Sequence, residues 1–385
     1  MNAPHQVHGM SLALAPPDWP ALTLEEIRRV LQRLPTLGDA QDVKWHSARP
    51  FSAAARVETA TGPVIVKRHH RRVRSVAALR EEHAFMAHLR RAGAPVVEVL
   101  HAADGQTAFA HDAWVYEVQR VGAGHDLYRD AVSWTPFIDT AHAHAAGAAL
   151  AQLHRAARGF AAPARSSAVL VANLQVFAQA EPLPALQRAL PTRPHLAAAL
   201  HGYPWQRDLV THVLPWHARA WPLLSAPGAM PPLWTHGDWH ASNLLWNTDH
   251  GATRVSAIFD FGLSDRNSAL FDLATAIERN LIPWLHLDTG ARAQPELAQL
   301  DALLDGYAAH CPLGAAQLRC LAALLPIVHV DFALSEIDYF AGITRSADNV
   351  DIAYHRYLLG HADWFSSADG QALLAHLHAR AHRSP

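Results

Sequence analysis

The sequence predicts an α+β protein in which a small β-rich lobe with one helix precedes a large, mostly helical lobe. Short strand-like segments separated by turn residues occupy the first third of the 385 residues. Helical periodicity dominates after about residue 139, and one compact β region interrupts it at 233–260. Strands followed by helices are typical of α+β architecture. We expect a lead-in at 1–20, a β-rich lobe at 21–120 and a helical lobe at 121–385.

Turn and capping signals divide the β-rich lobe. Thr23 is followed three residues later by Glu26, which is the pattern of a helix capping box. The turn Thr61-Gly62-Pro63 separates two alternating apolar segments, as in a hairpin. The elements expected here are a helix after Thr23, strands at 54–60 and 64–68, a helix at 75–92, and strands at 96–101 and 113–120.

The helical lobe is predicted from apolar residues that recur at helical spacing. Inside its β region, the turn at 248–251 separates NLLWN from RVSAIFD, which predicts a hairpin. The helices expected in this lobe lie at 139–158, 206–220, 269–282, 294–310, 314–345 and 367–382.

Composition excludes several classes of protein. Hydrophobic residues make up 50% and charged residues 17%, an ordinary globular balance. The net charge of -2 gives no global field that would attract nucleic acid, and we expect no nucleic-acid partner. The one local exception, the basic run from Lys67 to Arg74, is expected on the surface of the lobe.

Location follows from what the sequence lacks. Two cysteines, Cys311 and Cys320, do not make a disulfide framework. The N-terminus has no basic start with a sustained apolar stretch, and no run of about 18 apolar residues predicts a membrane span. We expect a cytoplasmic protein without a membrane partner, and the sequence does not indicate its oligomeric state.

One constellation of residues points to chemistry. His236-Gly237-Asp238 is followed by four residues and then Asn243, and Asp260-Phe261-Gly262 begins 17 positions beyond Asn243. Phosphoryl transfer needs positioning and charge neutralisation more than covalent catalysis. An Asp and an Asn supply the hard oxygen ligands that Mg²⁺ prefers, and a second Asp can accept the proton of an attacking hydroxyl. The alternative is that both acids are structural turn or strand-end residues.

Two upstream residues complete the pattern. The strand Pro63 to Lys67 ends in a lysine, the residue type that contacts ATP phosphates in kinases. Glu82 shares the apolar face of the helix at 75–92, so it needs a partner, and Lys67 is the expected one. Alternatively, Lys67 protects a sheet edge and Glu82 faces solvent.

At these residues the chain resembles the aminoglycoside phosphotransferase family, which also includes choline, homoserine and fructosamine kinases. The resemblance rests on HGDWHASNLLW, IFDFG and GLSDRNSALFDLA, and extends more loosely from about residue 40 to about 345. It implies a protein-kinase-like bilobal fold that uses ATP and Mg²⁺. By this resemblance Asp238 is the catalytic base, and Asn243 and Asp260 hold the metal ion.

The resemblance also implies a nucleotide site. Lys67 would contact the ATP phosphates and be oriented by Glu82, and the adenine-binding hinge would lie from Glu117 to Gly122, with Gln119 as a nucleotide contact. The phosphate-covering loop at 47–56 has no glycine, and Ser52 is the candidate contact there. His236 and Asp272 match positions that hold the catalytic loop in shape.

The acceptor is predicted to be a small molecule with a hydroxyl group. Acidic residues at the C-terminal helices would suit a cationic acceptor, and aromatic residues could line its pocket; these candidates are Asp331, Glu336, Asp338, Trp239, Trp284 and Tyr339. Three other functions stay open: a protein Ser/Thr kinase of the stress response kinase type, a non-catalytic nucleotide-binding module, and a metal-dependent hydrolase that uses His236, Asp238 and His240.

Overall fold

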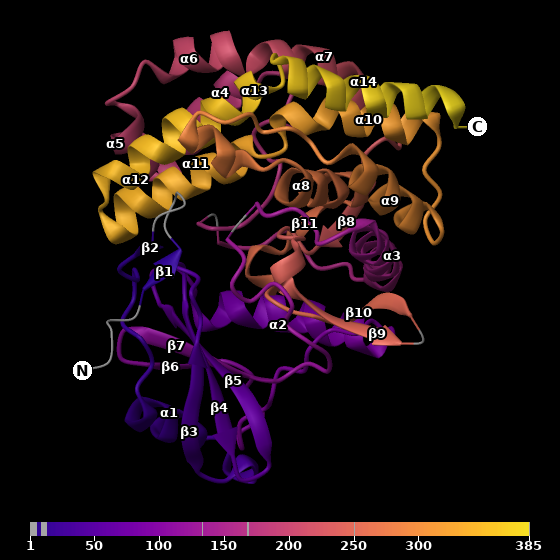
Figure 1. Cartoon of the computed structure of the whole chain (residues 1–385). Helices are drawn as coiled ribbons and strands as arrows, with labels where there is room; N and C mark the ends of the chain where they lie inside the picture. The colour runs from indigo at the N-terminus through magenta and orange to yellow at the C-terminus, as the bar shows by residue number, and fades with distance from the viewer. Residues whose placement is uncertain (1–5, 9–13, 133, 168, 250, 385) are drawn as a thin grey trace.

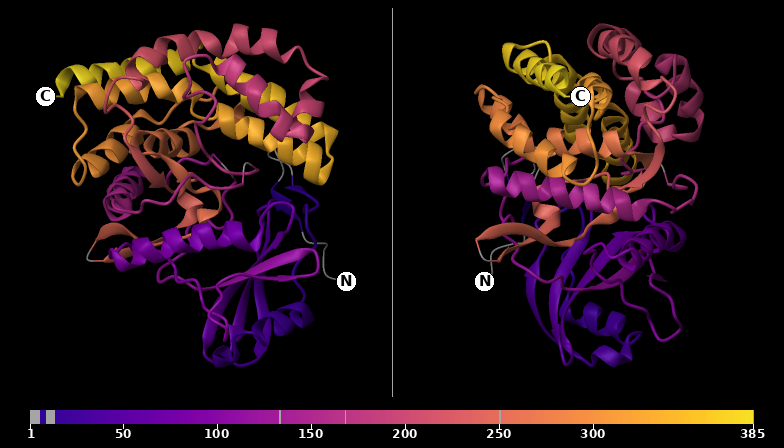
Figure 2. Two further views of the ribbon diagram at one scale, coloured as in Figure 1. Left: turned by 180° about the vertical axis from the view of Figure 1, so that it is seen from behind. Right: turned by 90° about the vertical axis from the view of Figure 1, so that its right-hand side faces the viewer.

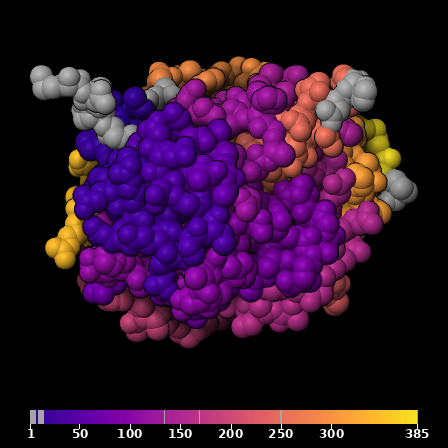
Figure 3. Space-filling view, turned by 90° about the horizontal axis from the view of Figure 1, so that it is seen from below, coloured from indigo at the N-terminus to yellow at the C-terminus, as the bar shows by residue number. Residues whose placement is uncertain are grey.

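An N-terminal sheet region and a C-terminal helical region make up the molecule (Figure 1). The structure, a computed structural model, describes residues 6–8, 14–132, 134–167, 169–249 and 251–384. Seen from below, N-terminal residues cover much of the molecular face (Figure 3). The predicted α+β fold is confirmed.

The N-terminal sheet is antiparallel, with strand order β3-β4-β5-β7-β6. Successive side chains of a strand point to opposite faces of the sheet, and those on one face, among them Val57, Val64 and Val66, are buried in a small core separate from the main one. The register sets Lys67 opposite Glu117 of the neighbouring strand. The strands are β3 Ala40–His46, β4 Ala53–Thr59, β5 Gly62–His70, β6 Phe109–His111 and β7 Trp114–Arg120.

The sequence located this sheet incompletely. It predicted neither β3 nor β6, and the strand expected at 96–101 is wrong. Val96 and Val99 form single bridges to Ile258 and Gln119 instead. A segment that switches partner after one bridge builds no ladder, but it ties the sheet to the β region of the helical lobe.

Two helices accompany the sheet, at the positions predicted after Thr23 and at 75–92, although the lobe as a whole was described as having one helix. α1 Leu24–Leu31 begins after Thr23, whose hydroxyl accepts from the Glu26 amide at 3.2 Å. α2 Val76–Arg91 lies between the sheet and the helical region in Figure 1 and the left view of Figure 2. Phe85 of α2 is buried in the same core as the C-terminal helices, so α2 joins the two regions.

The basic run from Lys67 to Arg74 is only in part the surface feature that was predicted. Arg68 donates to the Glu26 carboxylate at 2.7 and 2.9 Å. Arg74 is buried and donates to backbone carbonyls, among them that of Val169 at 2.6 Å. These side chains connect parts of the fold, because the first half of the run lies in the central strand β5. Arg71 and Arg72, in the turn after it, are exposed as predicted.

The lead-in is tied to the body of the protein from residue 14 onward. The short strands β1 Val7–His8 and β2 Leu14–Ala15 pair antiparallel. Trp19 then stacks on His70, with ring centroids 4.9 Å apart.

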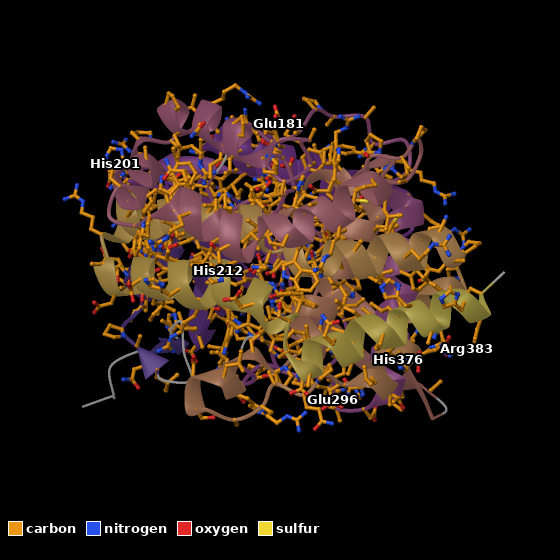
Figure 4. The ribbon with its side chains drawn as sticks, turned by 90° about the horizontal axis from the view of Figure 1, so that it is seen from above. Glu181, His201, His212, Glu296, His376 and Arg383 are labelled. Carbon is orange, nitrogen blue, oxygen red and sulfur yellow. The ribbon has the colours of Figure 1, made fainter. Side chains whose placement is uncertain are left out.

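The helical region packs its long helices closely. A Cβ at Gly147 would lie 1.9 Å from the Leu303 carbonyl oxygen, so only glycine lets α3 and α9 approach this far. Figure 4 shows the outer helices from above, with His376 and Arg383 on α14. The α-helices are α3 Thr140–Ala157, α4 Pro182–Ala189, α5 Pro194–Leu200, α6 Trp205–His212, α7 Leu214–Leu224, α8 Ala269–Leu281, α9 Leu297–Ala308, α10 Ala315–Leu324, α11 Val330–Tyr339, α12 Ala347–Ile352, α13 His361–Trp364 and α14 Ala368–Arg383.

Shorter helical segments link these helices. Two of them are π-helical, at Phe340–Thr344 and Ala353–Gly360. The 3₁₀ segments are Pro35–Leu37, Leu190–Thr192, Ala241–Asn243, Phe261–Leu263, Trp284–Thr289 and Leu325–Ile327.

One continuous helical segment, Ala315–Thr344, is long and apolar enough to cross a membrane by length and composition alone. Of the most apolar 18-residue stretch of this segment, 94% is buried inside the fold. Its apolar character is that of a core helix.

The β region of the helical lobe contains two antiparallel pairs. β9 Leu244–Asp249 and β10 Ala252–Ile258 form the predicted hairpin. β8 Pro232–Thr235 pairs with β11 Asp265–Ser268. Thr235, the last residue of β8, pairs with Asp265, the first residue of β11, so the segment after β8 begins where the segment between β10 and β11 ends. These two segments carry Asp238 and Asp260.

Candidate active site

A buried carboxylate holds the loop that follows β8. Asp272, near the start of α8, accepts from the backbone amides of His236 and Gly237, both at 2.9 Å, and is 0% exposed. Gly237 has φ 77°, and a Cβ there would lie 2.6 Å from the Leu263 carbonyl oxygen. Farther along the loop, Asn280 accepts from the Ala241 amide at 2.9 Å. The loop is fixed at both ends, as predicted for Asp272.

Both ring nitrogens of His236 are committed to the backbone. Nδ1 accepts from the Asp238 amide at 3.2 Å, so Nε2 carries the proton and donates to the Phe259 carbonyl at 2.9 Å. Neither nitrogen can then ligate a metal. Within the described residues, no group of three or more His, Cys, Asp or Glu is placed to hold a metal ion. The hydrolase reading of His236, Asp238 and His240 is not supported.

Asp238 lies among positive groups. Its Oδ1 lies 3.6 Å from Arg279 Nε, and its Oδ2 lies 3.5 Å from His240 Nε2. Burial alone would raise the pKa of Asp238, but the nearby His240 and Arg279 outweigh it and hold the pKa below its ordinary value. Burial lowers the pKa of His240 itself, so Arg279 is the lasting positive charge beside Asp238 at neutral pH. Asn243 Nδ2 donates to the same carboxylate at 3.1 Å. Asp238 is therefore ionised and oriented at neutral pH.

Asp260 and Lys67 form a close ion pair, with Lys67 Nζ 2.6 Å from Asp260 Oδ1. Asp260 has φ 58° and ψ 67°, a left-handed backbone that non-glycine residues seldom adopt and that concentrates at functional sites. Burial would lower the pKa of Lys67, yet the charges of Asp260, Glu117 and Glu82 raise it.

The predicted ion pair between Lys67 and Glu82 is wrong. Glu82, 1% exposed, pairs instead with Arg165, whose Nη1 lies 3.5 Å from Glu82 Oε2. Arg165 is 0% exposed and also donates to the Ala78 carbonyl at 2.8 Å. Glu82 needed a partner, as the sequence indicated, but Asp260 is the carboxylate in contact with Lys67.

Two cavities meet at these side chains. The larger, about 390 Å³, lies between the sheet and the β9–β10 hairpin, and Gln119 lines it. The smaller, about 130 Å³, contains Asp238 and is called the inner cavity below. Five residues line both cavities: Arg49, Ser52, Lys67, Asn243 and Asp260. Of the residues predicted for catalysis, nucleotide binding and metal binding, only Glu82 lines neither cavity.

Of the six residues predicted to form the acceptor site, two line cavities and four make contacts inside the fold. Glu336 lines the inner cavity, whereas Asp338 accepts from Arg193 Nε at 2.9 Å and Asp331 accepts from the Val176 amide at 2.8 Å. Trp239 is 0% exposed in the core, and the Tyr339 hydroxyl donates to Asp18. The prediction is therefore wrong for these four residues, which the helix packing uses internally. Trp284 lines a third cavity, of about 350 Å³.

Glu336 is expected to make stability depend on pH. Burial raises the pKa of its carboxyl to about 8, opposed by the charge of Arg279. In the unfolded chain this carboxyl releases its proton near pH 4.5. Its contribution to folding stability is therefore complete below that pH and is lost as the pH rises to about 8. Glu336→Gln cannot ionise. In thermal unfolding, we expect the Tm of Glu336→Gln to rise relative to the Tm of wild type as the pH increases from 5 to 9. The exposed Glu296→Gln should show no such trend, and a pH-independent difference for Glu336→Gln would contradict the assignment.

Sequence reasoning missed three arginines that adjoin predicted site residues. Arg49, in the loop without glycine, donates to Ser242 Oγ at 2.6 Å. Arg279 lies seven positions after Asp272 on α8, so the two share a helix face, and that spacing could have revealed it. Arg165 lies in an irregular segment and gave no signal.

Comparison with known proteins agrees with this geometry. The model of the phosphotransferase enzyme family matches residues 49–313, more than half of the chain. A search of curated protein sequences found no match.

Similar solved structures extend over nearly the whole chain. An amicoumacin kinase in complex with AMP-PNP, Ca²⁺ and Ami has a TM-score of 0.54 at 16% identity, covering 92% of this chain and 92% of that chain. A microcompartment-associated aminopropanol kinase has a TM-score of 0.53 at 15% identity, covering 91% and 98%. An aminoglycoside phosphotransferase from Alicyclobacillus acidocaldarius has a TM-score of 0.51 at 16% identity, covering 90% and 95%. At such identities the likeness shows the fold, and the family match makes the conclusion direct: the chain belongs to the phosphotransferase enzyme family.

Proposed function

We propose that this phosphotransferase moves the γ-phosphoryl group of ATP, with Mg²⁺, to a hydroxyl group of a small molecule. The observation that carries the proposal is the junction of two cavities at Arg49, Ser52, Lys67, Asn243 and Asp260. A phosphoryl donor in one cavity and an acceptor in the other would meet at these side chains. Asp238 lines the acceptor side only.

The larger cavity suits the nucleotide. Its volume of about 390 Å³ is in the range of small-molecule sites, and hinge residues Gln119 and Gly122 line it. Lys67 and Arg49 lie where it meets the inner cavity, so their charges can face the phosphates. Residues 21–120 would then form the nucleotide-binding lobe. The similar amicoumacin kinase binds AMP-PNP and Ca²⁺, which supports a nucleotide and a divalent ion here.

Asn243 and Asp260 fit a magnesium site. The Asn243 amide nitrogen is committed to Asp238, which leaves its carbonyl oxygen as the remaining ligand atom. Asp260 supplies a carboxylate held in a strained backbone. Mg²⁺ often takes only one or two protein ligands and completes its shell with phosphate oxygens and water. When bound, the ion neutralises phosphate charge.

Asp238 accepts the proton of the acceptor hydroxyl as the oxygen attacks the γ-phosphorus. One O–P bond forms, the O–P bond to ADP breaks, and the proton passes to the carboxylate. Its lowered pKa makes Asp238 a weak base, so orienting the hydroxyl is a large part of its role. Arg279 and His240 hold the carboxylate in place for this role.

A thermal shift experiment tests the nucleotide half of the proposal. Saturating Mg·ATP should raise the Tm of wild type by a few degrees, because a ligand that binds only the folded state stabilises it. Asp260→Ala should lose most of that shift, and the distant Asp301→Asn should keep it. A wild-type protein that shows no shift with Mg·ATP would refute the nucleotide site.

A further inference from the structure

Trp134 separates the inner cavity from the third cavity, of about 350 Å³, which is called the outer cavity below. It is the single described residue that lines both. The inner cavity alone, about 130 Å³, has room for a hydroxyl-bearing end of a molecule but for little more. An acceptor larger than a few heavy atoms must therefore extend beyond the inner cavity, and the indole lies where the outer cavity could receive the rest of it.

The indole is held in place at some cost to the backbone. Trp134 has φ 58°, which is a conformational outlier for a bulky side chain. Its Nε1 donates to Glu278 Oε1 at 3.2 Å. Its ring makes edge contacts with Tyr357 and His361, both with centroids 5.8 Å away. A strained backbone with a fixed ring at a cavity boundary indicates a selected position.

The outer cavity is walled by aromatic rings. Trp284 stacks on His361 at a centroid distance of 3.6 Å, and Tyr357 closes the side toward Trp134. The charged residues in this lining, Asp288 and Arg356, pair with each other at 2.5 Å. Burial holds the pKa of His361 well below its ordinary value, so that ring is neutral. The surface is suited to stacking a flat, uncharged group.

The inner cavity disfavours a cationic acceptor. The Arg279 guanidinium lies 5.5 Å from the Trp134 ring and 5.3 Å from the Phe332 ring, where an ammonium group would otherwise bind. Arg49 adds a second positive charge to the lining. Lys67 and Arg74 also line this cavity, so among the described residues four cationic side chains face three carboxyl groups, those of Asp238, Asp260 and Glu336. Burial raises the pKa of Glu336 to about 8, so the positive charges outnumber the negative ones at neutral pH.

We propose that Trp134 determines acceptor specificity, and that the acceptor is an uncharged hydroxyl compound with an aromatic ring. Its hydroxyl end occupies the inner cavity beside Asp238, and its ring lies against Trp134 and Tyr357 in the outer cavity. The inference rests on the proposed phosphotransfer and narrows its substrate class.

Matched probes test this with the full-length protein and a non-hydrolysable ATP analogue with Mg²⁺. Calorimetry would give the Kd of phenyl β-glucoside and methyl β-glucoside, of 2-phenylethanol and 1-propanol, and of glucosamine. In wild type the aromatic member of each pair should bind about tenfold more tightly, the strength of one aromatic contact. Trp134→Ala should reduce this ratio to about twofold, and Trp134→Phe should retain part of it.

Two further variants keep the test decisive. Trp134→Gly removes the ring at a φ that suits glycine, so it reports on the ring even if the alanine variant unfolds. Trp221→Ala, which removes a half-buried tryptophan outside the cavities, should keep the wild-type ratio.

Several outcomes would overturn the inference: equal or undetectable binding of both members of each pair, an unchanged ratio in the Trp134 variants, or tighter binding of glucosamine than of the glucosides. The Mg·ATP thermal shift separates the two proposals. A shift without aromatic preference refutes the role of Trp134 alone, and aromatic preference without a shift refutes phosphotransfer from ATP.

Discussion

Replacing Asp238 with alanine is expected to lower kcat by about 10²–10⁴-fold, the range for loss of a general base, with nucleotide binding nearly unchanged. The carboxylate lines the inner cavity and is absent from the lining of the larger cavity, where the nucleotide is proposed to bind. Its loss should therefore affect the step that involves the acceptor hydroxyl. Steady-state ADP release with an acceptor, together with the Mg·ATP thermal shift, measures both halves of this prediction.

The controls for Asp238 use one conservative and one distant change. Asp238→Asn keeps the shape of the side chain but removes the negative charge and turns one acceptor oxygen into an amide donor, so its kcat should fall nearly as far. Asp301→Asn, which alters an acid paired with His376 and Arg380 far from the cavities, should keep wild-type kcat. An Asp238→Ala enzyme with full activity would mean that another group positions the hydroxyl.

Arg165→Ala is expected to lower the free energy of unfolding by roughly 3–5 kcal/mol, because it leaves a buried carboxylate without its partner. Glu82 is 1% exposed, and Arg165 is its ion-pair partner among the described residues. The same guanidinium donates to the carbonyls of Ala78 and Gly262, at 2.8 and 3.2 Å. Urea unfolding of the variant and wild type would measure the loss.

A double variant separates the lost ion pair from the lost packing. Glu82→Gln combined with Arg165→Met removes both charges, so it should recover a large part of the stability that Arg165→Ala loses. The exposed Arg188→Ala should change the unfolding free energy by less than about 0.5 kcal/mol. If Arg165→Ala is as mild as Arg188→Ala, Glu82 does not depend on this pair.

The sequence located the residues of the proposed reaction better than it located their neighbours. Asp238, Asn243 and Asp260 lie close together along the chain, and a local hairpin sets their relation, so spacing alone predicted the cluster. Helical periodicity showed that Glu82 is buried. It could not show what lies opposite, because Arg165 reaches Glu82 from 83 residues away.

The acceptor residues were the least predictable part of the site. Asp331, Glu336 and Asp338 lie on one helix, and only the packing of that helix decides which of them faces the cavity. Asp338 turned out to bind Arg193, a contact between segments 145 residues apart. Trp134 has no sequence signal, since its position depends on an irregular segment and a left-handed backbone.

The most direct test of the central claim follows the phosphoryl group itself. Wild type is incubated with Mg·[γ-³²P]ATP and a mixture of small hydroxyl compounds, and the label is then located. We expect label in a phosphate ester of a small molecule, formed by wild type and greatly reduced in Asp238→Ala. Label on a protein would indicate a protein kinase instead, and label found only in ATP would mean that this site does not transfer phosphate.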